Sequence, residues 1–201
     1  MNGLCKNRRI VLASASPRRK ELLTQVGFEF DIITSDCEEI TTKTKPSEVV
    51  EELSYLKAAD VADKLDKQSE QLLIIGSDTV VALDDIIMGK PKNEEDAFRM
   101  LKALQGREHS VITGVTMIFT ESGREDKTIV FSKETKVWFY SMNDDEIRAY
   151  IDTKEPMDKA GAYAIQGLCA AYIERIEGDY NTVVGLPVAE ICKVIREYKE
   201  D

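Results

Sequence analysis

The chain has 201 residues, 43% of them hydrophobic and 32% charged, an ordinary composition for a globular protein with one sizeable core. Its formal net charge of -10, from 37 acidic and 27 basic residues, argues against DNA or RNA as the main partner, because nucleic-acid binders usually carry a basic excess. No apolar run approaches the ~20 residues that a membrane helix needs. We therefore expect a soluble, cytoplasmic protein with no nucleic-acid or membrane partner.

Strand-like and helix-like segments alternate through the first half of the chain. The short apolar run over 72–75 is typical of a strand that is buried on both faces. The expected elements, in chain order, are a strand over 9–14, a helix over 17–26, a strand over 28–34, a helix from Pro46 to about Asp66, a strand over 72–75, a hairpin over 80–87 that turns at Asp84-Asp85, and a helix over 93–104.

The second half opens with strand-rich sequence and ends with a helix. The expected elements are strands over 110–120 and 128–140 joined by a turn around Ser122-Gly123, a helix over 143–152 capped by Asn143, a glycine-flanked stretch over 158–167, a strand near 170–176, and a helix over 187–198. No repeat, low-complexity segment or linker interrupts the chain. We expect one mixed α/β domain over residues 1–201, with two lobes around a central cleft.

Residues 13–19 predict an anion site at the turn between the first strand and the first helix. Ser16 suits the N-cap and Pro17 the first helical position, since its missing N–H would be unbonded there anyway. Such a helix start presents free backbone N–H groups and a partial positive charge, and Arg18 and Arg19 stand beside them. The pattern indicates a phosphate-bearing ligand.

Cysteine and histidine usage narrows the chemistry. Four cysteines, at positions 5, 37, 169 and 192, form no Cys-x-x-Cys pair, and no secretory signal precedes them, so we expect four reduced thiols. The single histidine, His109, excludes a multi-histidine metal cage, and its neighbours look like the entry to a strand rather than a catalytic loop. A catalytic metal must then depend on oxygen ligands, which favours Mg²⁺ or Mn²⁺.

Two charged residues break the local pattern. Lys57 completes the apolar stripe of Val50, Leu53 and Val61 on the helix that begins at Pro46, a placement that costs free energy unless the ammonium finds a partner. Asp78 follows the buried strand after a glycine, where an open α/β sheet usually binds its ligand. A lysine at the edge of the stripe and a plain turn at the aspartate are the structural alternatives.

Three further segments carry weaker signals. Glu38-Glu39 follows the second strand and could be a solvated loop or supply a metal ligand opposite Asp78, and Lys90 lies in a constrained Gly-Lys-Pro turn. Gln166 presents an amide donor and acceptor side by side, a pair that matches the N3–H and O4 edge of uracil or thymine, although an incidental surface glutamine is the alternative. The usual nucleotide fingerprints, GxxxxGK[ST] and GxGxxG, are absent.

Taken together, these segments resemble the Maf family of nucleotide pyrophosphatases from Leu12 to Pro187. Many short motifs in the right order make the resemblance specific. The matching pieces are Ala13-Ser14-Ala15-Ser16-Pro17-Arg18-Arg19, Glu39, Lys57-Ala58, Ser77-Asp78-Thr79-Val80, Gly89-Lys90-Pro91, His109-Ser110-Val111-Ile112-Thr113-Gly114-Val115, Glu155-Pro156-Met157-Asp158-Lys159-Ala160-Gly161 and Val184-Gly185-Leu186-Pro187. Ser77 stands where many relatives have alanine.

The resemblance implies a Maf/ITPase-like fold and hydrolysis of nucleoside triphosphates to monophosphates and pyrophosphate with a divalent metal, Mg²⁺ or Mn²⁺. It implies Asp78 as the base that activates water and Glu39 as a second metal ligand. Ser14, Ser16, Arg18, Arg19, Lys57 and Lys90 would bind the substrate. Arg18, Thr79 and Gln166 match the specificity residues of the branch that acts on dTTP, UTP and modified pyrimidine relatives. The family often forms homodimers, although no segment here identifies an interface.

Two other functions compete with this interpretation. The first is a nucleotide-binding regulator of cell division that has little turnover, which the intact Asp78, Glu39 and Lys90 disfavour. The second is a purine-directed pyrophosphatase of the ITP-hydrolysing type, which Gln166 and the pyrimidine-branch pattern disfavour.

Overall fold

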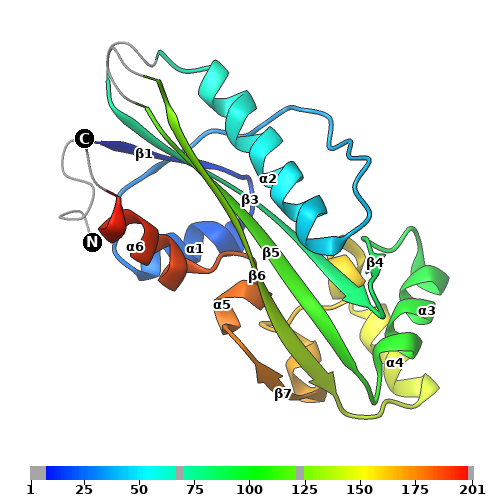
Figure 1. Cartoon of the computed structure of the whole chain (residues 1–201). Coiled ribbons are helices and arrows are strands. Elements are labelled where there is room, and N and C mark those ends of the chain that lie inside the picture. The colour runs from blue at the N-terminus through cyan, green and yellow to red at the C-terminus, as the bar shows by residue number, and fades with distance from the viewer. Residues whose placement is uncertain (1–7, 67–69, 121–124, 199–201) are drawn as a thin grey trace.

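The computed structural model describes residues 8–66, 70–120 and 125–198, built around a mixed seven-stranded sheet (Figure 1). The strand order is β2-β1-β3-β5-β6-β7, with β4 attached to β3. The strands are β1 (Arg9–Ala13), β2 (Asp31–Ile32), β3 (Leu72–Leu83), β4 (Ile86–Met88), β5 (Glu108–Phe119), β6 (Lys127–Phe139) and β7 (Ile173–Glu177). The helices are α1 (Pro17–Gln25), α2 (Pro46–Asp63), α3 (Glu94–Leu104), α4 (Asp144–Asp152), α5 (Tyr180–Val184) and α6 (Val188–Glu197).

Helix α2 lies across one face of β3 and β5 (Figure 1). Two glycines on these neighbouring strands permit the close approach. A Cβ atom at Gly76 would come within 2.4 Å of the Ser54 carbonyl oxygen, and one at Gly114 within 2.3 Å of the Val50 carbonyl oxygen. Both obstacles are helix backbone, which cannot move aside. The glycines therefore set the height of α2 above the sheet.

The opposite face of the sheet carries two separate apolar clusters, and each cluster with its helices forms one lobe of the domain. Leu73 and Ile75 of β3 pack with α1 and α6, whereas Val81 and Leu83 pack with α3 and α4. Side chains alternate along a strand, so Ser77 and Thr79 occupy the same face between these clusters. The two lobes are therefore separated by a polar stretch of β3.

The edge of β3 is uncovered at the same place. Strand β1 pairs with β3 in parallel and ends at Ala13 opposite Gly76, while β4 pairs with the same edge only from Val81 onward. In the described sheet, residues 77–80 of β3 consequently have no neighbouring strand on this side. The gap gives a ligand access to the middle of the sheet.

Most expected elements are confirmed to within a few residues, including the hairpin turn, where Asp84 and Asp85 both have positive φ. The expected end of a strand after Ile75 is wrong, because β3 continues through Asp78 while still paired with β5. The strand expected over 28–34 shrinks to Asp31–Ile32. The strand expected near 170–176 begins only at Ile173, because 168–172 forms a 3-10 turn. Helix α5 was not predicted, and the turn around Ser122-Gly123 lies outside the described residues.

Among the described residues, no helix is both long and apolar enough to cross a membrane. Cys37, Cys169 and Cys192 are free thiols, and burial raises the pKa of Cys169 to about 12. Cys5 lies outside the described residues.

His109 is a buried residue of the α3–α4 lobe rather than part of a catalytic triad. It is 3% exposed, its Nε2 lies 2.8 Å from the Tyr163 hydroxyl, and its ring meets those of Phe139 and Tyr163 edge-on. Burial lowers its pKa to about 4. The imidazole is therefore neutral at physiological pH.

This burial makes the stability of the protein depend on pH. His109 takes up a proton near pH 6.5 in the unfolded chain but only near pH 4 in the folded chain. Its contribution to the free energy of unfolding is therefore complete above pH 6.5 and is lost as the pH falls through this window. We expect the group to contribute about 3 kcal/mol to that decline. Urea unfolding between pH 7 and 4 should show a shallower decline for His109→Gln, and identical slopes would contradict the assignment.

Candidate functional site

A cavity of about 740 Å³ opens at the uncovered edge of β3, between the two lobes. Its volume is within the range of small-molecule sites. Its walls come from the β1–α1 turn, the 34–39 loop, α2, β3, the turn after β4, the 158–166 segment and the 183–185 segment. All the predicted site residues line it: Ser14, Ser16, Arg18, Arg19, Glu39, Lys57, Asp78, Thr79, Lys90 and Gln166.

The charge of the cavity is opposite to that of the whole chain. Five cationic side chains line it, those of Arg18, Arg19, Lys57, Lys90 and Lys159, against three carboxylates, those of Glu39, Asp78 and Asp158. The local excess is two positive charges, whereas the formal net charge of the protein is -10. Such a concentration of cations in a cleft attracts anions.

The β1–α1 turn directs a helix N-terminus at the cavity, as the sequence predicts. Pro17 occupies the first turn of α1, which contains no acidic residue. Ser16 is the N-cap, as predicted, although its side chain makes no capping hydrogen bond. Its backbone N–H instead donates to Ser14 Oγ at 3.2 Å. The first N–H groups of α1 have no acceptor within the helix and can donate hydrogen bonds to a phosphate oxygen.

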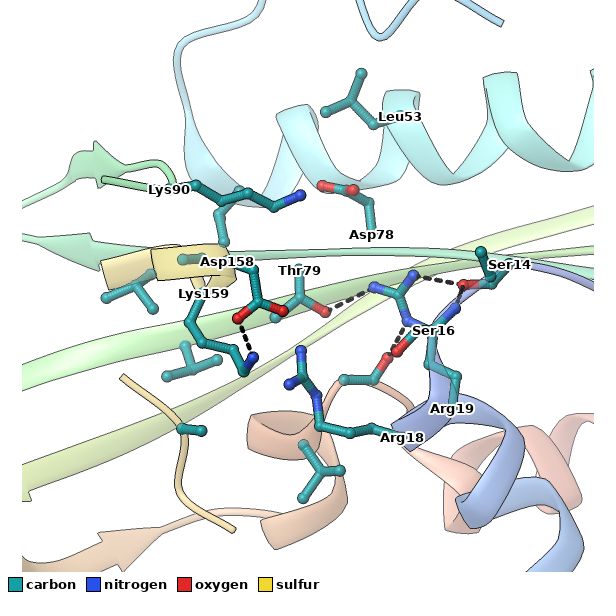
Figure 2. A pocket seen from close by; sticks show the side chains of 18 of the residues that line it. Ser14, Ser16, Arg18, Arg19, Leu53, Asp78, Thr79, Lys90, Asp158 and Lys159 are labelled. Atoms are coloured by element: carbon teal, nitrogen blue, oxygen red, sulfur yellow. Dashed lines mark hydrogen bonds and ion pairs between the residues drawn. The ribbon is translucent and has the colours of Figure 1, made fainter. Parts of the chain in front are cut away.

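Arg19 ties this turn to the sheet (Figure 2). It donates from Nε to the Gly185 carbonyl oxygen at 2.9 Å, from Nη1 to Ser14 Oγ at 3.1 Å, and from Nη2 to Thr79 Oγ1 at 3.2 Å. Burial lowers its pKa, although an arginine stays protonated at physiological pH. Arg19 is a positive charge held in a fixed position by protein contacts.

Lys57 finds the partner that its place on the apolar stripe requires. Its Nζ lies 2.6 Å from Asp78 Oδ1 and 3.2 Å from Glu39 Oε2. The side chains of Lys57 and Asp78 are only 13% and 12% exposed, whereas that of Glu39 is 56% exposed. The lysine therefore gathers two carboxylates from separate segments at one wall of the cavity.

Asp78 and Thr79 lie on opposite faces of β3 at the uncovered edge (Figure 2). Asp78 points toward α2, and Thr79 points toward Arg19, with its Oγ1 also 2.9 Å from Thr113 Oγ1. The sequence predicted Asp78 just beyond the end of its own strand, but the residue lies within β3. It lies beyond the end of β1, so the relevant strand end belongs to the neighbour.

The carboxylates of Glu39 and Asp78 suit a divalent metal of the Mg²⁺ or Mn²⁺ type, but two side chains cannot fill its coordination shell. Carboxylate oxygens are the preferred ligands of these ions. In the described part of the chain, no group of three or more His, Cys, Asp or Glu side chains is placed to hold a metal. Two carboxylates fit a metal that takes its remaining ligands from water and substrate phosphates.

Several cavity residues were not singled out from the sequence. Lys159 pairs with Asp158, and this pair, with a smaller effect from Arg18, lowers the pKa of Asp158. Ser77 is buried and does not line the cavity, but its Oγ donates to the carbonyl oxygen of the cavity residue Gly185 at 3.1 Å. The only advance signals were the polar character of the 158–167 segment and the departure from alanine at position 77.

The turn that holds Lys90 is joined to the 158–167 segment. The Gly161 N–H donates to the Gly89 carbonyl oxygen at 3.1 Å, and Lys90 and Gln166 are both exposed side chains on the cavity wall. The structure thus assembles cations, carboxylates and an amide around one opening, from segments spread between residues 14 and 185.

Comparison with known proteins shows similarity along nearly the whole chain. The Maf-like protein family matches residues 9–198. A dTTP/UTP pyrophosphatase from Lachnoclostridium phytofermentans is 49% identical, over 96% of each chain. One from Thermoanaerobacter sp. (strain X514) is 48% identical, over 94% of this chain and 95% of the relative. Among solved structures, the Staphylococcus aureus Ham1 protein is 17% identical with a TM-score of 0.49, over 96% of this chain and 100% of that one.

Proposed function

This chain belongs to the Maf family, and we propose that it is a nucleoside triphosphate pyrophosphatase that converts dTTP and UTP to the monophosphate and pyrophosphate. The observation that carries the proposal is the convergence of all the predicted site residues on one cationic cavity. We treat residues 1–201 as a single catalytic domain. A cytoplasmic location and a homodimer remain predictions, as does action on modified pyrimidine nucleotides.

The proposed reaction is attack of water on the α-phosphorus. Asp78 accepts a proton from the attacking water, the new P–O bond forms, and the bond from the α-phosphorus to its bridging oxygen breaks to release pyrophosphate. Asp78 suits the role because it is a carboxylate held in position by Lys57 at the cavity wall, 2.6 Å away. No histidine competes for it, since the only one, His109, is buried against Tyr163.

The cationic residues of the cavity suit a triphosphate. Arg18, Lys57 and Lys90 line it, with Lys57 shared between Asp78 and Glu39, and the N-terminus of α1 adds backbone N–H donors. A divalent metal held by Glu39 and Asp78 would neutralise phosphate charge as the leaving group departs. Fixed positive groups of this kind stabilise developing negative charge without reorganisation.

Base selectivity is proposed to reside in Gln166, together with Arg18 and Thr79, which also line the cavity. The amide oxygen of Gln166 would accept from uracil N3–H and its nitrogen would donate to O4. Gln166→Glu replaces the donor by an acceptor, so we expect kcat/KM for UTP to fall about tenfold to a hundredfold and the UTP-to-CTP ratio to fall with it. Steady-state kinetics on both substrates will measure this, and an unchanged ratio would remove the base-reading role.

A panel of dTTP, UTP, CTP and ITP with Mg²⁺ or Mn²⁺ separates the candidate functions through pyrophosphate release. The proposed enzyme turns over dTTP and UTP in preference to the others. Binding of these nucleotides without turnover would favour the regulator of cell division instead. Preference for ITP would favour a purine-directed enzyme.

A further inference from the structure

We propose that Tyr150 and Glu155 are positioning residues that hold Gln166 in register with the base, an inference that rests on the proposed function. Neither residue lines the cavity. Tyr150 lies on α4, and Glu155 lies in the 3-10 turn that follows this helix. They act on the substrate only through the backbone around Gln166.

Three hydrogen bonds fix that backbone on both sides of Gln166. The Tyr150 hydroxyl donates to Glu155 Oε1 at 2.8 Å and accepts from the Ala164 N–H at 3.3 Å. The other carboxylate oxygen, Glu155 Oε2, accepts from the Leu168 N–H at 3.0 Å. Ala164 and Leu168 each lie two residues from Gln166. Gln166 thus lies in the middle of a five-residue segment, 164–168, whose two ends are hydrogen-bonded to the Tyr150–Glu155 pair.

The pair is firmly supported. Tyr150 is 4% exposed, and α4 is anchored in the core by Ile147 and Ile151, which are 0% and 3% exposed. Burial, with a smaller effect from Glu155, raises the pKa of Tyr150, so its hydroxyl keeps the proton that it donates. An unmet hydrogen bond at this depth costs more than one at the surface.

Gly167 closes the arrangement. A Cβ atom there would lie 2.2 Å from Glu155 Oε1, because the carboxylate rests directly against the backbone next to Gln166. The glycine has φ of -107°, so the restriction comes from contact with Glu155 and not from backbone strain. Gly167→Ala should therefore displace the Glu155 carboxylate, including the oxygen that accepts from the Tyr150 hydroxyl, and so disturb Gln166.

The test compares Tyr150→Phe, Glu155→Gln and their double variant with Ile147→Val, a buried change on the same helix that touches none of the three hydrogen bonds. We expect each single variant to lower the UTP-to-CTP ratio of kcat/KM about tenfold, mainly through KM for UTP, with kcat changed less than about threefold. The double variant should lose little more than either single one, as expected of one unit. Amide exchange at Ala164 and Leu168 should accelerate, and Ile147→Val should leave the ratio and these amides unchanged.

The outcomes separate this proposal from the function on which it rests. If Gln166→Glu loses selectivity while Tyr150→Phe and Glu155→Gln keep it, the positioning role is overturned and base reading stands. If the wild-type enzyme shows no preference for UTP, or Gln166→Glu keeps it, both are overturned. If Ile147→Val loses selectivity to the same extent, the effect is general destabilisation and the positioning role also fails.

Discussion

Asp78→Asn is expected to lower kcat for UTP by about 10²–10⁴-fold, the largest effect of any single substitution in the cavity. The asparagine has the same shape and its oxygen can still accept a hydrogen bond from Lys57, which approaches Asp78 Oδ1 at 2.6 Å. It can neither accept the proton of the attacking water nor contribute a negative charge to a metal. The loss should therefore appear in turnover rather than in folding.

Asp84→Asn is the matched control for this variant. Asp84 follows directly on β3 but lies outside the cavity, and asparagine tolerates its positive φ of 52°. Single-turnover measurements of both variants, with thermal unfolding of each, will separate chemistry from stability. An Asp78→Asn enzyme that retains more than a tenth of wild-type kcat would contradict the assignment of the base.

Lys57→Met should cause the second-largest loss, about 10²–10³-fold in kcat/KM for UTP. Methionine preserves the apolar stem on the α2 stripe but removes the ammonium. Asp78 and Glu39, 2.6 Å and 3.2 Å from that ammonium, would then face each other without the charge that gathers them. The substrate would also lose one of the cations that we propose bind its phosphates.

Two further variants check this prediction. Lys57→Arg keeps the charge and should recover part of the activity. Lys64 is the C-cap residue of the same helix, and its ammonium pairs with Asp36 and Asp60 outside the cavity. Lys64→Met should therefore retain wild-type kinetics. Equal kinetics for Lys57→Met and Lys64→Met would show that the Lys57 charge has no part in the reaction.

The site was predictable wherever one residue contradicted its surroundings. Lys57 interrupts an apolar stripe in which Val50 and Val61 are fully buried, so a partner for its charge was required. The Ser-Pro-Arg-Arg sequence predicted a helix start with cations beside it. In both cases local physics demanded a partner, and the fold supplies it from a distant segment.

The fold was less predictable where tertiary contacts override local preference. The run Gly76-Ser77-Asp78-Thr79 resembles the end of a strand, yet it stays in the sheet because it pairs with β5 and because α2 passes directly over Gly76. Helix α5, with five residues, is too short to show a helical period. Neither feature could be obtained from composition or spacing.

Long-range contacts explain the remaining omissions. Arg19 reaches the Gly185 carbonyl oxygen across 166 positions of sequence, and the Ser77 hydroxyl reaches the same atom across 108. The bonds from Tyr150 and Glu155 to the backbone around Gln166 use ordinary residue types in ordinary positions. Such roles become visible only when the partners are seen together.

Hydrolysis of UTP in ¹⁸O-labelled water tests the central claim most directly. Attack at the α-phosphorus predicts equal amounts of UMP and pyrophosphate, with one ¹⁸O atom in UMP and none in pyrophosphate. Release of UDP and phosphate, or label in pyrophosphate, would place the attack at another phosphorus and contradict the account. No turnover of either UTP or dTTP would remove the enzymatic function itself.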